Sequence, residues 1–140
     1  MVKVKKYLGQ NFLHDKNILY TIVEAGEIKT EETVIEIGPG KGILTAELIK
    51  RAGKVIAIEK DRDLIPFLKL TFQSKKNFEL VEADALKWNP PQTPYKVIAN
   101  IPYYITSPLL NHFLKEQFIP GFRPFLRNYD VIYNLLYLTF

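Results

Sequence analysis

The sequence predicts a doubly wound α/β fold, in which helices cover both faces of a mostly parallel sheet. Strand-like runs alternate with helix-like segments between residues 33 and 118, which is the chain order of βαβ units. The run from Lys54 to Glu59 is apolar between its charged ends, as expected for a strand covered on both faces. A length of 140 residues suits one such domain with its own core and does not accommodate a second.

Two kinds of local pattern place the elements of the first half of the chain. Helices are expected where apolar residues recur at helical spacing before a glycine, and strands where β-branched residues form a short run. These criteria predict helices at residues 17–27 and 43–52 and strands at residues 33–37 and 54–59.

The second half continues the alternation. Asp61 or Asp63 is a candidate N-cap for the next helix, and Pro66 is tolerated only in its first turn. The prediction is helices at residues 61–70 and 107–118 and strands at residues 77–82, 95–99 and, in the tail, 131–140.

Composition and charge narrow the class of protein. Hydrophobic residues make up 47% and charged residues 24% of the chain, which is ordinary for a globular domain and excludes disordered and fibrous classes. The net charge of +4 is mild, but lysines gather near the N-terminus. Lys3, Lys5 and Lys6 are therefore candidate contacts to a phosphate backbone. The alternative is a solvated basic segment that only aids solubility.

Several classes of site and location are not expected. The chain has no cysteine, which fits a reducing compartment and leaves no thiolate for a metal or a disulfide. No apolar run is long enough to span a bilayer, and no signal-peptide pattern is present. His14 and His112 stand apart from other metal ligands, so both are expected to be ordinary surface or loop histidines. We expect a cytoplasmic protein without a metal.

A glycine turn and an acidic residue indicate a nucleoside cofactor. Gly38, Gly40 and Gly42 follow the strand at 33–37, where glycine lets the backbone turn sharply and approach a ligand. Glu59 closes the next strand 21 positions after Gly38, the place of the carboxylate that binds ribose hydroxyls in dinucleotide-binding folds. A purely structural turn is the alternative for the glycines alone.

The spacing favours S-adenosylmethionine over NAD. A nicotinamide site needs Gly-x-Gly-x-x-Gly, and here Gly42 comes one residue early. S-adenosylmethionine needs a close turn, an acid for the ribose and a polar partner for the adenine amine. Asp84, after the third predicted strand, can accept a hydrogen bond from that amine. Its alternative role is an ordinary loop or cap aspartate.

The segment Asn100-Ile101-Pro102-Tyr103 follows the apolar run of the fourth predicted strand. The Asn100 oxygen and the Ile101 carbonyl, with Pro102 fixing the turn, can each accept one N–H of an adenine amine. Tyr103 can stack on a base extruded from RNA or DNA. These residues predict methyl transfer to the adenine amine; the alternative is a simple turn, in which Asn-x-Pro is common.

Five segments follow one another along the chain: Gly9 to Leu13, Glu36 to Gly42, Ile58 to Asp61, Glu82 to Ala85 and Asn100 to Ile105. Together they resemble the ribosomal RNA adenine N6,N6-dimethyltransferases. The resemblance implies a Rossmann-like methyltransferase fold and S-adenosylmethionine as cofactor. It also implies a substrate, two adjacent adenosines near the 3′ end of small-subunit ribosomal RNA. The implied cofactor contacts are Asn11, Leu13, Gly38, Gly40, Glu59, Asp84 and Asn100.

Three alternatives to that activity remain open at the level of sequence. A sister branch, the macrolide-resistance methylases, modifies one adenosine of large-subunit ribosomal RNA and shares the first two motifs. A DNA adenine methylase fits the acceptor chemistry but not the Gly9 to Leu13 segment. After Phe118 the chain departs from the family pattern, so an impaired RNA-binding fragment is the third alternative. We expect a monomer with a basic segment at 1–16, a catalytic domain at 17–118, truncated at its C-terminal side, and a divergent aromatic tail at 119–140.

Overall fold

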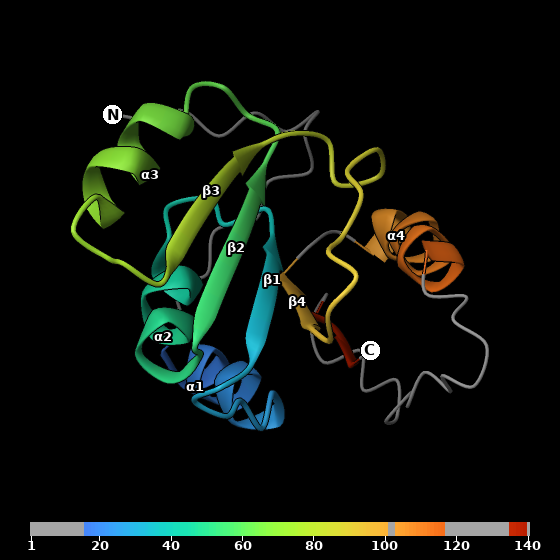
Figure 1. Ribbon diagram of the computed structural model, residues 1–140, viewed down its shortest axis with the longest axis horizontal. Helices are drawn as coiled ribbons and strands as arrows, with labels where there is room; N and C mark the ends of the chain where they lie inside the picture. Colours follow the sequence, from blue (N-terminus) through green and yellow to red (C-terminus); the bar gives the residue numbers. More distant parts are fainter. Residues whose placement is uncertain (1–15, 101–102, 117–134, 140) are drawn as a thin grey trace.

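A computed structural model describes residues 16–100, 103–116 and 135–139 of the chain. Strands and helices alternate along the described residues, except that a loop without a helix joins β3 to β4 (Figure 1). The elements are α1 (Lys16–Ala25), β1 (Thr33–Ile37), α2 (Ile43–Arg51), β2 (Lys54–Glu59), α3 (Ile65–Phe72), β3 (Phe78–Glu82), β4 (Lys96–Asn100), α4 (Tyr103–Glu116) and β5 (Leu135–Thr139).

The strands form one sheet in the order β3-β2-β1-β4-β5. The pairs β1–β2, β2–β3 and β1–β4 are parallel, whereas β5 runs antiparallel to β4. The chain builds outward from β1 to β3 and then crosses back to place β4 on the other side of β1. This confirms the predicted doubly wound, mostly parallel sheet. Its strand order reverses between β1 and β4, the position at which such sheets bind ligands.

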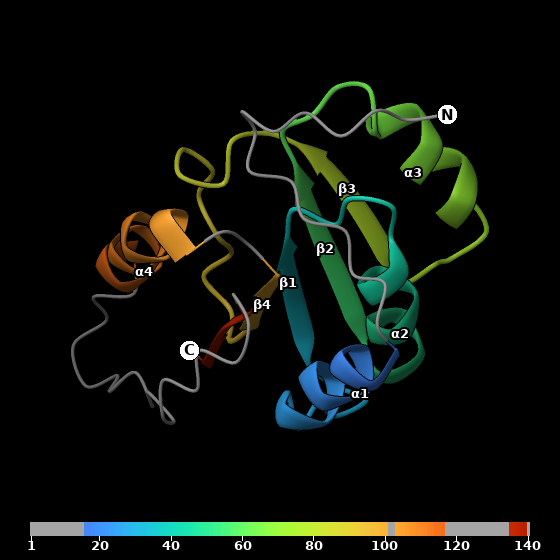
Figure 2. The ribbon, with the colours of Figure 1, turned by 180° about the vertical axis from the view of Figure 1, so that it is seen from behind.

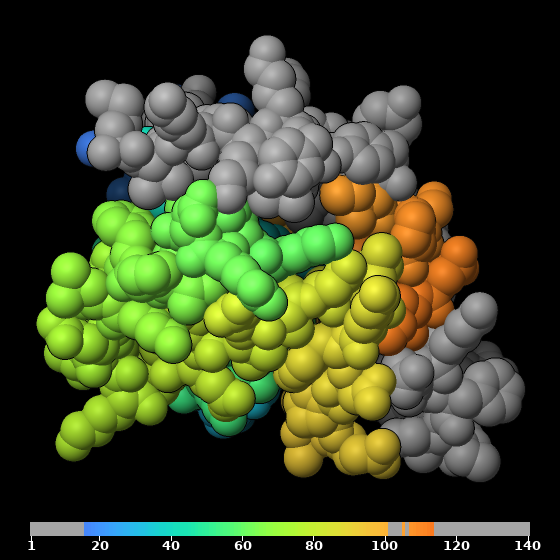
Figure 3. Space-filling model, turned by 90° about the horizontal axis from the view of Figure 1, so that it is seen from above, coloured from blue at the N-terminus to red at the C-terminus, as the bar shows by residue number. Residues whose placement is uncertain are grey.

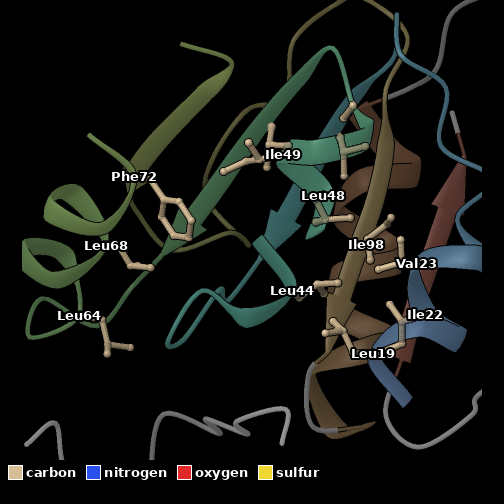
Figure 4. Close-up of a cluster of buried hydrophobic side chains, with 13 residues drawn as sticks. Leu19, Ile22, Val23, Leu44, Leu48, Ile49, Leu64, Leu68, Phe72 and Ile98 are labelled. Carbon is tan, nitrogen blue, oxygen red and sulfur yellow. The ribbon is translucent and has the colours of Figure 1, made fainter. Parts of the chain in front are cut away.

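Each face of the sheet is covered by its own hydrophobic cluster, because side chains alternate along each strand. On one face, α1, α2 and α3 pack on Val34, Val55 and Ile98. Figure 4 shows Ile98 of β4 lying among side chains of α1 and α2. On the other face, Leu109 and Phe113 of α4 pack on the alternate residues of the strands, and Figure 2 shows α4 set apart from the other three helices.

A buried lysine fastens the amino end of the sheet. Lys96, the first residue of β4, is only 7% exposed. Its Nζ lies 2.8 Å from Glu32 Oε2 and donates to the carbonyls of Gly26 at 3.1 Å and Glu27 at 2.8 Å. Because Gly26 and Glu27 follow α1, this one cation joins α1, the start of β1 and the start of β4.

A second polar side chain holds α2 at the same end of the sheet. Asn77, just before β3, donates from Nδ2 to the carbonyls of Ile49 at 2.9 Å and Ala52 at 3.0 Å. These carbonyls belong to the end of the helix, where the last carbonyl groups have no partner within the helix. The contact ties α2 to β3.

The predicted N-cap of α3 is wrong. The helix begins at Ile65, and Leu64 occupies the N-cap position without a side-chain hydrogen bond. Asp61 instead accepts the N–H of Asp63 at 3.0 Å, so both residues belong to a turn before the helix. Such local bonding by aspartate competes with capping. Pro66 lies in the first helical turn, as predicted.

Other boundaries also shift. The strands β1 and β2 begin and end where predicted, whereas α4 begins at Tyr103, four residues before the expected start. Ile105 packs against the hydrophobic cluster that contains Leu109 and Phe113. This contact supports the extra helical turn ahead of Pro108. Of the strand predicted in the tail at residues 131–140, the structure describes Leu135–Thr139, which form β5.

Candidate cofactor and catalytic site

Four of the predicted site residues meet at one edge of the sheet. Gly38 follows β1, Glu59 closes β2, Asp84 follows β3 and Asn100 closes β4. Since these strands are parallel and adjacent in register, their carboxyl ends lie together. Figure 3 looks down on this edge, where the segments after β2 and β3 and the helix α4 lie next to one another.

The glycine turn has one open side and one packed side. Gly38, Gly40 and Gly42 have φ values of 68°, 59° and 78°, a backbone region that other residues adopt only with strain. Among the described residues, a Cβ on Gly38 would meet no heavy atom within 4 Å, whereas one on Gly42 would lie 2.6 Å from the ring of Phe72. Gly42 is therefore needed for packing, and Gly38 leaves room for a ligand.

The carboxylate of Glu59 holds the glycine turn against the end of β2. Glu59 is 4% exposed, and its Oε1 accepts the N–H groups of Lys60 and Asp61, both at 2.8 Å. Its Oε2 accepts a longer bond of 3.3 Å from the N–H of Gly40. Burial raises the pKa of Glu59, although these three bonds oppose the rise. The carboxylate oxygens retain capacity to accept ligand hydroxyls.

A second buried carboxyl lies beneath the turn. Glu36 is 1% exposed and accepts a hydrogen bond of 2.6 Å from the hydroxyl of Thr45 on α2. Strand alternation and the pairing of Glu36 with Ala57 place it on the same face as Glu59. Burial, together with the like charge of Glu59, raises the pKa of Glu36 to about 8. The sequence interpretation gave Glu36 no role, although a carboxylate within a β-branched run was the available signal.

Asp84 is paired in a way that the sequence did not indicate. Its Oδ2 lies 2.8 Å from Lys60 Nζ, and its Oδ1 accepts the N–H of Leu86 at 3.1 Å. The hydrogen bond from Lys60 is the main cause of a lowered pKa at Asp84. This carboxylate is therefore ionised at neutral pH and points an acceptor oxygen toward a cation.

The predicted catalytic segment, Asn100 to Tyr103, is described only in part. Asn100 is the half-buried last residue of β4, rather than the residue after the strand, and Tyr103 begins α4. Ile101 and Pro102 lie outside the described residues. So do the remaining predicted site residues, namely Asn11, Leu13, Lys3, Lys5 and Lys6, as well as His14.

His112 differs from the prediction of a surface or loop residue. It is half-buried on α4, with Nε2 2.8 Å from the carbonyl oxygen of Trp88 and its ring edge-on to Phe113. Within residues 16–100, 103–116 and 135–139, no group of three His, Asp or Glu side chains could hold a metal. In the same part of the chain, no helix is long and apolar enough to cross a membrane.

Comparison with known proteins identifies the family. The family described as Ribosomal RNA adenine dimethylase matches residues 1–124. The chain belongs to this family. Among its relatives, a Ribosomal RNA small subunit methyltransferase A from Dehalococcoides mccartyi is 43% identical over 99% of this chain and 49% of its own length. The protein of the same name from Clostridium botulinum is 48% identical over 82% of this chain and 44% of its own length.

Two solved methyltransferase structures share the fold. The 23S rRNA methyltransferase ErmE matches with a TM-score of 0.72 and 37% identity, over 76% of this chain and 44% of its own. A dimethyladenosine transferase from Plasmodium falciparum matches with a TM-score of 0.69 and 36% identity, over 78% of this chain and 40% of its own. The chain thus spans about half the length of the relatives it matches.

Proposed function

We propose that this chain forms the cofactor-binding and catalytic part of an adenine N6-methyltransferase that acts on ribosomal RNA. The observation that carries the proposal is the convergence of Gly38, Glu59, Asp84 and Asn100 at the carboxyl edge of the sheet, in a member of the adenine dimethylase family. The proposed methyl donor is S-adenosylmethionine. The ribosomal substrate agrees with the cytoplasmic location expected from the sequence.

The described residues fit this cofactor. The open side of Gly38 leaves room for a ligand, Glu59 offers carboxylate oxygens to ribose hydroxyls, and Asp84 offers an acceptor to the adenine amine. Asn11 and Leu13, by family resemblance, complete the proposed contacts. The bound cofactor would supply an electrophilic methyl group on a sulfonium, whose departure leaves a neutral thioether.

The role of the chain is to present the target amine. The nitrogen of an adenine amine is a weak nucleophile because its lone pair is delocalised into the ring. In our proposal, the Asn100 side-chain oxygen and the Ile101 carbonyl accept its two N–H groups and favour the localised, pyramidal form. Pro102 fixes the turn and Tyr103 stacks on the extruded base. Alignment supplies much of the acceleration, and the proton leaves the methylated nitrogen for water.

The small-subunit branch is the proposed target class, with two neighbouring adenosines near the 3′ end of its RNA. The relatives named small subunit methyltransferase A support it over 82–99% of this chain. The similarity to ErmE, a 23S rRNA methyltransferase, is the specific observation that supports the large-subunit alternative. Lys3, Lys5 and Lys6 are the proposed contacts to the RNA backbone in either case.

The proposal is tested in two steps. Calorimetric titration with S-adenosylmethionine should show one binding site. Radiolabelled methyl groups should then pass to small ribosomal subunits that lack the modification, and not to large subunits. Transfer to large subunits alone would favour the alternative branch. Binding without transfer to either subunit would favour the impaired RNA-binding fragment, and absence of binding would contradict the proposal.

The first variant to test is Asn100→Ala. We expect transfer to fall by about 100-fold or more, the usual loss when a group that stabilises a transition state is removed. Cofactor affinity should stay within about threefold, because Gly38, Glu59 and Asp84 are unchanged. Asn111→Ala, at an exposed position on α4, is the matched control and should keep wild-type transfer. Unchanged turnover in Asn100→Ala would remove Asn100 from the mechanism.

A further inference from the structure

We propose that Lys60 competes with the cofactor for Asp84, and so sets the affinity of the site and its dependence on salt. The inference rests on the proposed function, because it takes Asp84 as the partner of the adenine amine. Lys60 then acts as an electrostatic latch: it occupies the carboxylate in the free protein and must release it on binding.

The Asp84 side chain accepts two hydrogen bonds, one on each carboxylate oxygen. Oδ1 is held by the N–H of Leu86 at 3.1 Å, and Oδ2 is held by Lys60 at 2.8 Å. The first bond belongs to the backbone turn after β3 and stays in place. The second belongs to a side chain that is 61% exposed, so it can rotate into water. Of the two partners, Lys60 is therefore the one that an incoming amine can displace.

The direction of the effect follows from the charges. In the free site the ammonium of Lys60 neutralises Asp84, with Lys87 as a further nearby cation. A neutral amine that replaces an ammonium gains a hydrogen bond but loses the ion pair. Exposed ion pairs of this kind are weak, so removing Lys60 should tighten binding by about two- to fivefold. High salt, which screens the pair in the wild type, should reduce that advantage.

The chain provides a matched control at the other end of β2. Lys54, the first residue of the strand, pairs with Glu79 at 2.6 Å, and both side chains are 49% exposed. Lys54→Met removes the same charge as Lys60→Met, but from the opposite end of β2, the strand that Lys60 follows. It does so at the amino edge of the sheet, away from the proposed site. It therefore reports any general effect of lowering the net charge.

The experiment measures the Kd of S-adenosylhomocysteine by calorimetry in wild type, Lys60→Met and Lys54→Met, at about 25 mM and 500 mM KCl. This ligand lacks the sulfonium charge, which limits long-range repulsion. S-inosylhomocysteine, which has no amine to donate to Asp84, is measured in parallel. Lys60→Gln repeats the test with a neutral polar side chain, and thermal unfolding checks that each variant is folded.

We expect Lys60→Met to bind S-adenosylhomocysteine about two- to fivefold more tightly than wild type at low salt, with the difference shrinking at high salt. The gain should be absent for S-inosylhomocysteine and absent in Lys54→Met. An equal gain in Lys54→Met, an equal gain for both ligands, or weaker binding in Lys60→Met would each overturn the latch. If the wild type binds neither S-adenosylhomocysteine nor S-adenosylmethionine, the result would instead count against the proposed function.

Discussion

The two ends of the sheet are built from opposite electrostatic arrangements. At the amino end, the cation of Lys96 meets the carboxylate of Glu32 and two backbone carbonyls. At the carboxyl end, two buried carboxyls, Glu36 and Glu59, share one face beneath a turn of left-handed glycines. The first end is satisfied within the protein. The second combines two buried acidic side chains and an unusual backbone, which is typical of a site that completes its contacts with a ligand.

Stability should therefore depend most on the amino end. We expect Lys96→Met to lower the free energy of unfolding by about 3–5 kcal/mol, because it leaves Glu32 and two carbonyls without their shared cation. Urea unfolding monitored by circular dichroism measures this loss. Lys54→Met, which breaks an exposed pair, should cost about 1 kcal/mol or less. Similar losses in the two variants would mean that burial of Lys96 contributes little.

The buried carboxyl of Glu36 at the carboxyl end of the sheet should make the free energy of unfolding depend on pH. The pKa of Glu36 is raised from 4.5 to about 8 by folding. Between these values the unfolded chain has released the proton and the folded protein has kept it, so stability falls as pH rises. We expect a loss on the order of 3–4 kcal/mol between pH 5 and pH 8 from this group.

The Glu36→Gln variant removes this titration while keeping an acceptor for Thr45. Its unfolding free energy should vary less between pH 5 and pH 8 than that of the wild type, with the larger gain at pH 8. Glu79→Gln, at an exposed position of β3, is the control and should retain the wild-type slope. A wild-type slope in Glu36→Gln would show that Glu36 is already ionised in the folded protein.

The smallest expected effect on the free energy of unfolding is the difference between substitutions at Gly38 and at Gly42. Gly38→Ala and Gly42→Ala both place a side chain at positive φ, so their difference isolates the contact of the new Cβ with Phe72 at position 42. We expect Gly42→Ala to be less stable than Gly38→Ala by about 1–2 kcal/mol in urea unfolding, the cost of overpacking. Gly38→Ala should instead weaken cofactor binding. Equal stability of the two variants would mean that Phe72 moves aside without cost.

Much of the fold was predictable because it depends on local patterns. The bounds of β1 and β2, the glycine turn and the acidic end of β2 follow from β-branched runs and their stop signals. The start of α3 was not predictable, since Asp61 uses its side chain in a turn instead of a cap. The start of α4 depends on packing of Ile105 against a cluster built from other elements.

The site was predictable as a set of strand ends but not as a set of contacts. Family resemblance and spacing indicated Glu59, Asp84 and Asn100, whose ligand roles remain predictions. The side-chain contacts at this edge of the sheet join residues that are far apart in the sequence. The hydroxyl of Thr45 on α2 donates to Glu36 on β1, and Lys60 lies 24 positions before its partner Asp84. Periodicity carries no information on such pairs, because they arise only when the strands are assembled.

Lys96 is the first residue of strand β4 and Asn100 is the last. The contacts of the buried Lys96 ammonium therefore help to fix the register of the whole strand. A slip of one residue would move Asn100 by about 3.3 Å along the sheet and turn Val97, Ile98 and Ala99 to the wrong faces. It would also pull the Lys96 ammonium away from its three acceptors. The contacts of Lys96 thus fix the position of Asn100, the proposed amine acceptor, from the other end of the strand. The alignment of the reacting groups depends in part on a residue four positions before Asn100.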